Sequence, residues 1–236
     1  MSVVIPITGM LIQRLRTRTL FPVAMGLFTA GTLIAAVAPG FLVLLLGRIV
    51  QAGGTAIMMP LLMTTVVVLV PERQRGRLMG RIAIVISVAP ALGPTVSGLI
   101  LQWLSWRWLF LFVLPIALAS LLIGLLRLPN VGTQRIVRVD VLSVLLSVIG
   151  FGGIVWGLSA SGEGADAEHL IPPVVLLGIG LAGLLLFVWR QIRLQREDRA
   201  LLDLRTFRTR PFALAVVLFT FASISLFGTL ILLPIY

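Results

Sequence analysis

Long apolar stretches separated by short polar ones dominate the chain. Seven of them are about 20 residues long or longer, the length that a helix needs to cross a bilayer. They lie at about 20–39, 41–70, 80–103, 107–127, 140–160, 170–190 and 211–236. A shorter apolar run at 1–12 precedes them. The pattern predicts an all-α, polytopic transmembrane helix bundle with about seven full spans and one partial span.

Composition supports the membrane prediction and excludes several kinds of site. Hydrophobic residues make up 59% of the 236 residues and charged residues 11%, with a mean hydropathy of +1.13. Soluble domains carry roughly a quarter charged residues, so this chain has too few to cover a surface in water. It has no cysteine and one histidine, His169, which excludes a disulfide framework and any thiolate or histidine metal cluster. We therefore expect a lipid bilayer as partner and no metal or other cofactor.

The basic residues sort by side of the membrane. All of them are Arg, and the formal net charge is +11. They gather in or beside alternate connecting segments, at 13–19, 71–79, 128–139 and 191–210, and the exceptions are Arg48 and Arg107. Positively charged loops stay in the cytoplasm, so these segments are predicted to be cytoplasmic in a multi-pass protein of the cell (inner) membrane. This sorting accounts for the charge without nucleic acid as a partner.

Arg48 is the first candidate for function, because it lies inside the predicted span 41–70. A charge inside the membrane is costly and needs a partner or a water-filled cavity, so such a residue is a functional candidate by default. Gln51 follows about one helical turn later on nearly the same face, and small residues come after it. The simpler alternative is an arginine that extends its side chain to the membrane surface.

A second candidate segment combines small residues with two prolines. Small residues at every fourth position predict a flat stripe that another helix can approach closely. Each proline removes a backbone donor and bends a helix. Ordinary helix packing explains the stripe but not the paired prolines. The residues of this segment are Ala89, Pro90, Gly93, Pro94, Ser97 and Gly98.

These two segments resemble motifs of the major facilitator superfamily. Arg48 and Gln51 match its fourth-span motif, and Gly93-Pro94-x-x-Ser97-Gly98 resembles the fifth-span antiporter motif. The segments 105–110 and 202–207 look like further signatures of its 14-span drug:proton antiporters, of the lincomycin-resistance and multidrug exporter type. A segment with Gly9, Arg14 and Arg18 resembles the gating loop between spans two and three, although Gln13 replaces the usual Asp.

The resemblance implies a domain organisation. Residues 1–127 would be an incomplete N-terminal transporter half with family spans two to six, and residues 128–192 the linker with the helix pair seven and eight. Residues 193–236 would hold a cytoplasmic loop and the first helix of the C-terminal half. On this alignment the sequence is incomplete at both ends. A helix over 1–12 agrees, since it would rise about 18 Å in a hydrocarbon core of roughly 30 Å.

The resemblance also implies a function, a membrane transporter that exports amphiphilic drugs or antibiotics in exchange for protons. Arg48 and Gln51 would serve proton coupling and transport. The family carries its coupling carboxylate in span one, whereas the eight acidic residues of this chain lie in loops or at span ends, Asp140 being the nearest to a span. Because Arg stays protonated, Arg48 would tune such a carboxylate and could not replace it.

The sequence also allows an alternative function. The chain would alternatively be a truncated, non-transporting membrane protein or gene remnant that acts only through association with other chains. An enzyme is not expected, because the sequence has no intramembrane Asp pair, no histidine metal site and no pairing of Ser with His.

Overall fold

The computed structural model describes residues 8, 11, 12, 14–128, 140–162, 171–195 and 204–232, and all regular structure within them is helical. The helices are α2 (Thr17–Ala36), α3 (Phe41–Leu69), α4 (Glu72–Trp103), α5 (Arg107–Arg127), α6 (Val141–Gly162), α7 (Pro173–Gln195), the short η1 (Leu204–Arg208) and α8 (Arg210–Leu232). The six from α2 to α7 are long and apolar enough to cross a membrane, and α8 is apolar over Arg210–Leu226. The all-α transmembrane prediction is confirmed.

The helix ends correct the predicted loops. Segment 71–79 was expected to be a loop, but α4 already begins at Glu72 after Pro71. Likewise, α2 begins at Thr17 inside 13–19, and α7 runs to Gln195 inside 191–210. The predicted bounds followed the edges of the apolar runs, whereas Arg, Gln and Glu are good helix formers and extend a helix beyond its apolar part. Residues 129–139 and 196–203 lie outside the described part.

Glycines allow α2 and α3 to pack closely against each other. A methyl group on Gly31 of α2 would lie 2.6 Å from the carbonyl oxygen of Gly47 and 2.4 Å from the backbone nitrogen of Gln51, both on α3. One on Gly54 would lie 2.4 Å from the carbonyl oxygen of Ala24. Missing side chains at these positions allow the two backbones to touch, as in other membrane helix pairs.

An apolar core forms where the first half of α2 meets the second half of α3. Its buried members are Leu20, Ala24, Ile57 and Leu61, and the partly buried Leu11, Ile12, Phe21 and Met58 pack against it. Farther along the chain, α5 docks on α2, where the ring of Phe21 occupies the place that a side chain at Gly124 would need. Leu11 and Ile12 of the predicted partial span 1–12 therefore lie against this core.

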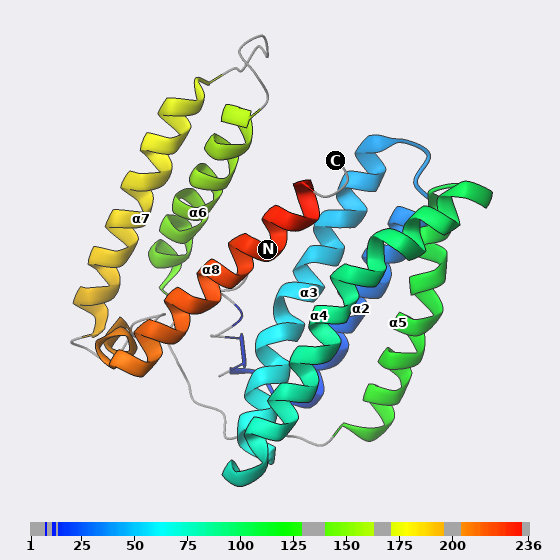
Figure 1. Ribbon diagram of the computed structural model, residues 1–236, viewed down its shortest axis with the longest axis horizontal. Helices are drawn as coiled ribbons and strands as arrows, with labels where there is room; N and C mark the ends of the chain where they lie inside the picture. Colours follow the sequence, from blue (N-terminus) through cyan, green and yellow to red (C-terminus); the bar gives the residue numbers. More distant parts are fainter. Residues whose placement is uncertain are drawn as a thin grey trace.

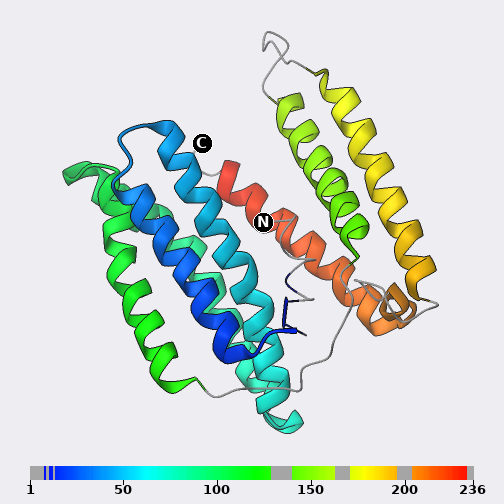
Figure 2. The same ribbon diagram turned by 180° about the vertical axis from the view of Figure 1, so that it is seen from behind.

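Helices α6 and α7 form a separate close pair (Figures 1 and 2). Gly153 lies against Gly180, where a methyl group added at Gly153 would be 2.7 Å from the Gly180 Cα. Gly150 and Gly183 meet in the same way one layer further. Glycines therefore allow α6 and α7 to approach each other closely, as they do for α2 and α3.

Two helices have little cover. Among the side chains that the structure describes, none on α4 is buried, and α4 touches α3 and α5 sparingly. Helix α8 contacts η1, and in projection it crosses between the bundle and the α6–α7 pair (Figure 1). Their apolar side chains, such as Val85, Leu92 and Phe219, are exposed.

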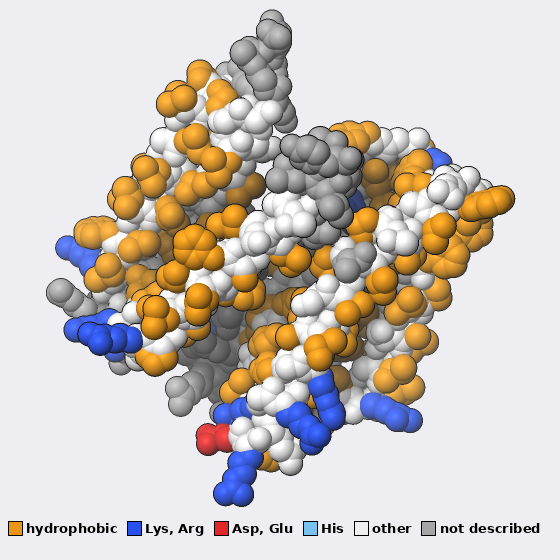
Figure 3. Space-filling model, in the orientation of Figure 1, with side chains coloured by type: hydrophobic (Ala, Val, Ile, Leu, Met, Phe, Trp, Pro, Cys, Tyr) orange, Lys and Arg blue, Asp and Glu red, His pale blue; other side chains and the backbone are white. Residues whose placement is uncertain are grey.

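The surface shows how the charges are arranged. Hydrophobic side chains cover the flanks of the helices, and Arg side chains gather at the ends of α4, α5 and α7 (Figure 3). At the junction of α3 and α4, Arg75 donates from Nε to the carbonyl oxygen of Val70 at 2.9 Å, which satisfies a free acceptor at the end of α3. Which membrane side these ends face stays a prediction.

We predict that replacing Gly31 by Ala destabilises the α2–α3 pair. The new methyl group meets backbone atoms, so the helices must separate, at a cost of roughly 1–3 kcal/mol. Gly26→Ala is the matched control, because Gly26 lies on the same helix with nothing within 4 Å of the added methyl group. Thermal unfolding in detergent, followed by tryptophan fluorescence, measures both variants. Equal unfolding temperatures for the two would contradict the close approach.

Candidate functional site

The first candidate site is a hydrogen-bonded chain of three side chains that crosses from α3 to α2. Arg48 donates from Nη1 to Oε1 of Gln51 at 2.8 Å. Gln51 donates from Nε2 to Oγ1 of Thr32 at 2.9 Å. Thr32 in turn donates to the backbone oxygen of Phe28 at 2.7 Å. Every group in this chain that is buried has its partner, as buried polar groups require.

Burial increases along the chain from α3 towards α2. Arg48 is exposed, Gln51 is 8% exposed and Thr32 is fully buried. Arg48 is the eighth residue of α3, so it lies about 10 Å along the helix axis from the start of that helix. Within the described residues it forms no ion pair, and the neutral Gln51 amide is its partner. The guanidinium lies on a face of α3 that the described residues leave exposed.

The second candidate site is a polar cluster between the start of α6 and the end of α7. Arg190 binds Asp140 with two parallel hydrogen bonds, Nε to Oδ2 at 2.8 Å and Nη2 to Oδ1 at 2.9 Å. Ser143 donates to the same carboxylate, and Gln191 donates from Nε2 to the Ser143 hydroxyl at 2.9 Å. Ser143 and Gln191 are fully buried. The cluster fastens the two helices at one end.

Asp140 is held in its charged form. The hydrogen bonds from Arg190 lower the pKa of Asp140 from 3.8 to about 2, and they outweigh the desolvation of the partly buried carboxyl, which raises it. The Ser143 hydroxyl and the charge of Arg190 act in the same direction. At neutral pH this carboxyl is therefore ionised and paired with Arg190.

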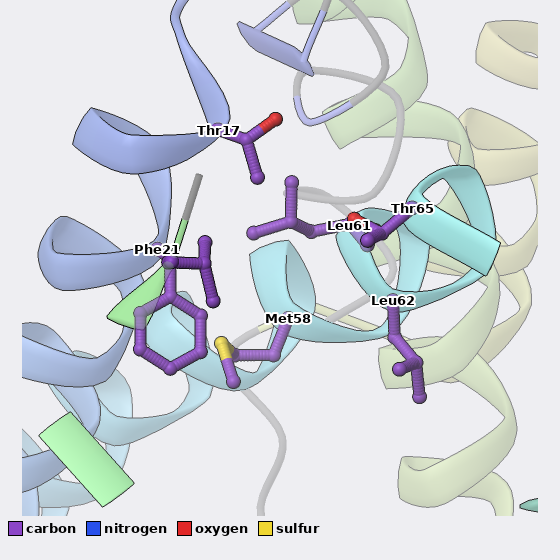
Figure 4. Close-up of a pocket in the computed structure, with 7 residues that line it drawn as sticks. Thr17, Phe21, Met58, Leu61, Leu62 and Thr65 are labelled. Carbon is purple, nitrogen blue, oxygen red and sulfur yellow. The ribbon is translucent and has the colours of Figure 1, made fainter. Parts of the chain in front are cut away.

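An apolar crevice of about 140 Å³ lies among α2, α3 and the end of α5 (Figure 4). It is lined by Thr17, Phe21, Met58, Leu61, Leu62, Thr65 and Leu128. In the close-up, the Phe21 ring and the Met58 side chain lie next to each other on one side. Two hydroxyls are its polar side-chain groups, so it offers few atoms to orient a ligand. Among the residues described, no group of His, Asp, Glu or Cys side chains is placed to hold a metal ion.

Comparison with known sequences assigns the family. The sequence profile of the Major Facilitator Superfamily matches residues 1–236. The chain belongs to this superfamily. The resemblance inferred from the fourth-span and fifth-span segments is thereby confirmed at the level of the superfamily.

The curated relatives carry drug-resistance and transporter names. The chain is 41% identical over 237 residues to the lincomycin resistance protein LmrB of Listeria monocytogenes, and 42% identical over 235 residues to the uncharacterized MFS-type transporter YcnB of Bacillus subtilis. It is 31% identical over 239 residues to the multidrug resistance protein B homolog of Mycobacterium tuberculosis. Each comparison covers 100% of this chain and 49%, 49% and 43% of the relative. The chain thus spans about half the length of the relatives it matches.

The structure brings together Arg48 and Gln51, as their spacing predicted, and adds Thr32, which sequence reasoning missed. Nothing in the sequence placed Thr32 opposite Gln51, because the partner on another helix depends on how both helices are rotated. The polar position 32 within an apolar span was the available signal. The roles of Arg48 and Gln51 in transport stay predictions.

The segment that resembles the fifth-span motif lies on α4, which has little cover among the described residues. This helix runs unbroken through Pro90 and Pro94. Among the described residues, no atom beyond the neighbouring backbone of α4 itself lies within 4 Å of a methyl group added at Gly93 or Gly98. The Ser97 hydroxyl donates to the carbonyl oxygen of Pro94 at 3.1 Å. The described residues therefore supply no helix against this stripe, and its packing role remains a prediction.

The predicted gating-loop residues are partly described. Arg14 and Arg18 are exposed beside the start of α2, and Gly9 lies outside the described residues. At the opposite end of α2, Arg107 donates from Nη2 to the carbonyl oxygen of Ala38 at 2.8 Å, and its guanidinium lies 4.6 Å from the centre of the Trp106 ring. Sequence reasoning quoted the Arg107 segment but missed this contact. The available signal in the sequence was that Arg107 is one of the few arginines away from the predicted cytoplasmic segments.

The charged cluster predicts a specific pH dependence of stability. Because folding lowers the pKa of Asp140, its contribution is complete above its ordinary pKa of 3.8 and is lost as the pH falls towards about 2. We expect the thermal stability of the chain in detergent to be insensitive to this group from pH 5 to pH 8 and to fall below about pH 4. Asp140→Asn should reduce that fall.

At pH 7, Asp140→Asn should cost about 1.5–3 kcal/mol, the range for hydrogen bonds to a charged group. Glu72→Gln serves as the control, because Glu72 is 87% exposed and lies 3.7 Å from Arg75, so its loss should change little. If the wild type and Asp140→Asn lose thermal stability over the same acid pH range, the ion pair between Asp140 and Arg190 does not govern that loss.

Proposed function

We propose that this chain forms part of a drug:proton antiporter that exports amphiphilic drugs or antibiotics from the cytoplasm. Its membership of the major facilitator superfamily and the lincomycin-resistance and multidrug-resistance names of its relatives support transport of such molecules. The observation within the chain that carries the proposal is the charged Arg48, held on a membrane-spanning helix by the Gln51 amide. A charge kept at that depth serves a pathway for a solute or a proton.

The chemistry of the described residues limits the role of Arg48. It does not release its proton at physiological pH, so its effect is electrostatic. A positive charge favours the ionised form of a nearby carboxyl and lowers the pKa of that carboxyl. Asp140 cannot be this carboxyl, because Arg190 already binds it at the end of the α6–α7 pair. We infer that Arg48 makes an acid elsewhere in the transporter release its proton more readily.

Substrate and location follow from the same considerations. The substrate would bind near the middle of the membrane, between two halves that move relative to each other, as in other transporters with repeated halves. An amphiphilic molecule fits helices whose exposed side chains are mostly apolar. The Arg-rich ends would face the cytoplasm of a multi-pass protein in the cell (inner) membrane.

Efflux measurements on cells that express this exact chain test the proposal. We expect a fluorescent amphiphilic cation such as ethidium to leave these cells faster than cells with an empty vector, and an uncoupler that collapses the proton gradient to abolish the difference. Cells that accumulate the dye equally with and without the chain would contradict independent transport by this chain. That result would favour the non-transporting alternative.

Arg48→Ala should slow this efflux by about tenfold or more, which corresponds to a loss of roughly 1.4 kcal/mol in the rate-limiting step. Arg48→Lys keeps the charge but not the planar fork of donors, and we expect it to retain intermediate activity. Arg77→Ala is the control, because it removes an exposed charge near the start of α4, away from Arg48 in the predicted cytoplasmic segment. Membrane amounts of each variant are matched by immunoblot. Arg48→Ala with wild-type efflux would exclude the proposed role.

A further inference from the structure

The hydrogen-bond chain from α2 to α3 has a direction that its chemistry fixes. A threonine hydroxyl has one proton and two acceptor sites, and an arginine has donors but no acceptor. The single proton of Thr32 goes to the carbonyl oxygen of Phe28, at 2.7 Å. Towards Gln51 the hydroxyl can therefore act only as an acceptor, so the NH2 end of the Gln51 amide must face it.

The other end of the amide is then determined as well. With its NH2 group on Thr32, Gln51 presents its oxygen to Arg48, whose Nη1 lies 2.8 Å away. A reversed amide would place two donors against each other at Arg48, and it would leave the Gln51 oxygen beside a hydroxyl whose proton is already used. The Thr32 hydroxyl thus selects the one amide orientation that can hold the guanidinium.

We propose that Thr32 is the positioning residue of this site, which acts through Gln51 to hold the Arg48 charge at one place on α3. Its significance for transport rests on the proposed function, in which Arg48 acts on a proton-carrying acid. The role in holding Arg48 is independent of that function. Thr32 is fully buried on a neighbouring helix and reaches Gln51 because Gly31, the residue before it, lets the two backbones touch.

The helix offers a matched control one turn earlier. Thr29 is 8% exposed, and its hydroxyl finds no hydrogen-bond partner within the part of the chain that the structure describes. Thr29→Val and Thr32→Val make the same chemical change in the same helix. The first removes a hydroxyl without a described partner, and the second removes the acceptor for Gln51.

The first experiment measures how firmly Arg48 is held, in the full chain in lipid nanodiscs. Phenylglyoxal modifies arginine side chains, and mass spectrometry of peptides gives the modification rate of Arg48 itself. Because reaction requires the guanidinium to leave Gln51, we expect Thr32→Val to raise the rate by about fivefold, the effect of losing one ordinary hydrogen bond. Thr32→Ser, which keeps the hydroxyl, and Thr29→Val should match the wild type.

Double variants separate positioning from a general loss of structure. Gln51→Leu removes the acceptor for Arg48, so adding Thr32→Val to it should not raise the modification rate further. If Thr32→Val does not fold, Thr32→Ala removes the same hydroxyl without a new methyl group and takes its place. An unchanged Arg48 rate in the hydroxyl-free variant, an equal increase in Thr29→Val, or additive effects with Gln51→Leu would each overturn the proposal.

An efflux measurement tests the transport part separately. In cells where the wild-type chain exports ethidium, Thr32→Val should slow export by about fivefold and Thr32→Ser should not. Wild-type export in Thr32→Val, together with a raised Arg48 modification rate, would overturn the link to transport while keeping the positioning role. If the wild type exports nothing, the proposed function fails, and the modification rates still decide the role of Thr32.

Discussion

The close approach of α2 and α3 at Gly31 is the contact on which the candidate site depends. A side chain on Gly31 would overlap the backbone of Gly47 and Gln51, so glycine at this position sets the distance between the two helices. At that distance a short threonine side chain on one helix reaches an amide on the other. In a bilayer, where apolar surface gives little drive for helices to associate, such tight packing and the hydrogen bonds that it permits supply much of the attraction.

The two polar clusters contain the same kinds of hydrogen-bonding group in the same order, but they differ in the last acceptor. In each, a glutamine NH2 donates to a buried hydroxyl, and that hydroxyl donates onward, Gln51 to Thr32 and Gln191 to Ser143. At Ser143 the next acceptor is a carboxylate neutralised by Arg190, so the cluster is closed and static. At Thr32 it is a backbone carbonyl, and the arginine at the other end of the amide forms no ion pair within the described part of the chain. This difference is the reason for proposing a role in transport at Arg48 and a structural role at Asp140.

The sequence was sufficient for the number and type of helices and for the pair Arg48 and Gln51. Apolar runs longer than a bilayer crossing leave little choice of structure, and residues three apart on a helix are neighbours by geometry. Helix ends were less predictable, because α4 extends its first turns through arginines that periodicity assigns to a loop. The partners Thr32 and Arg190 were not predictable either. Contacts between helices depend on rotation and depth, which a single sequence does not fix when every face of a helix is apolar.

The order of contacts along the chain has a consequence for how the protein is made. Helices α2 and α3, and likewise α6 and α7, pack on their immediate neighbours in sequence, so each pair can close soon after both members leave the ribosome and enter the membrane. Helix α5 then docks on α2 through Phe21 and Gly124, past α4. Within the described residues α4 contacts α3 and α5 only sparingly, and Pro90 and Pro94 lie in its interior. We infer that α4 is the last helix of this group to gain cover and the segment where assembly is most open to interference.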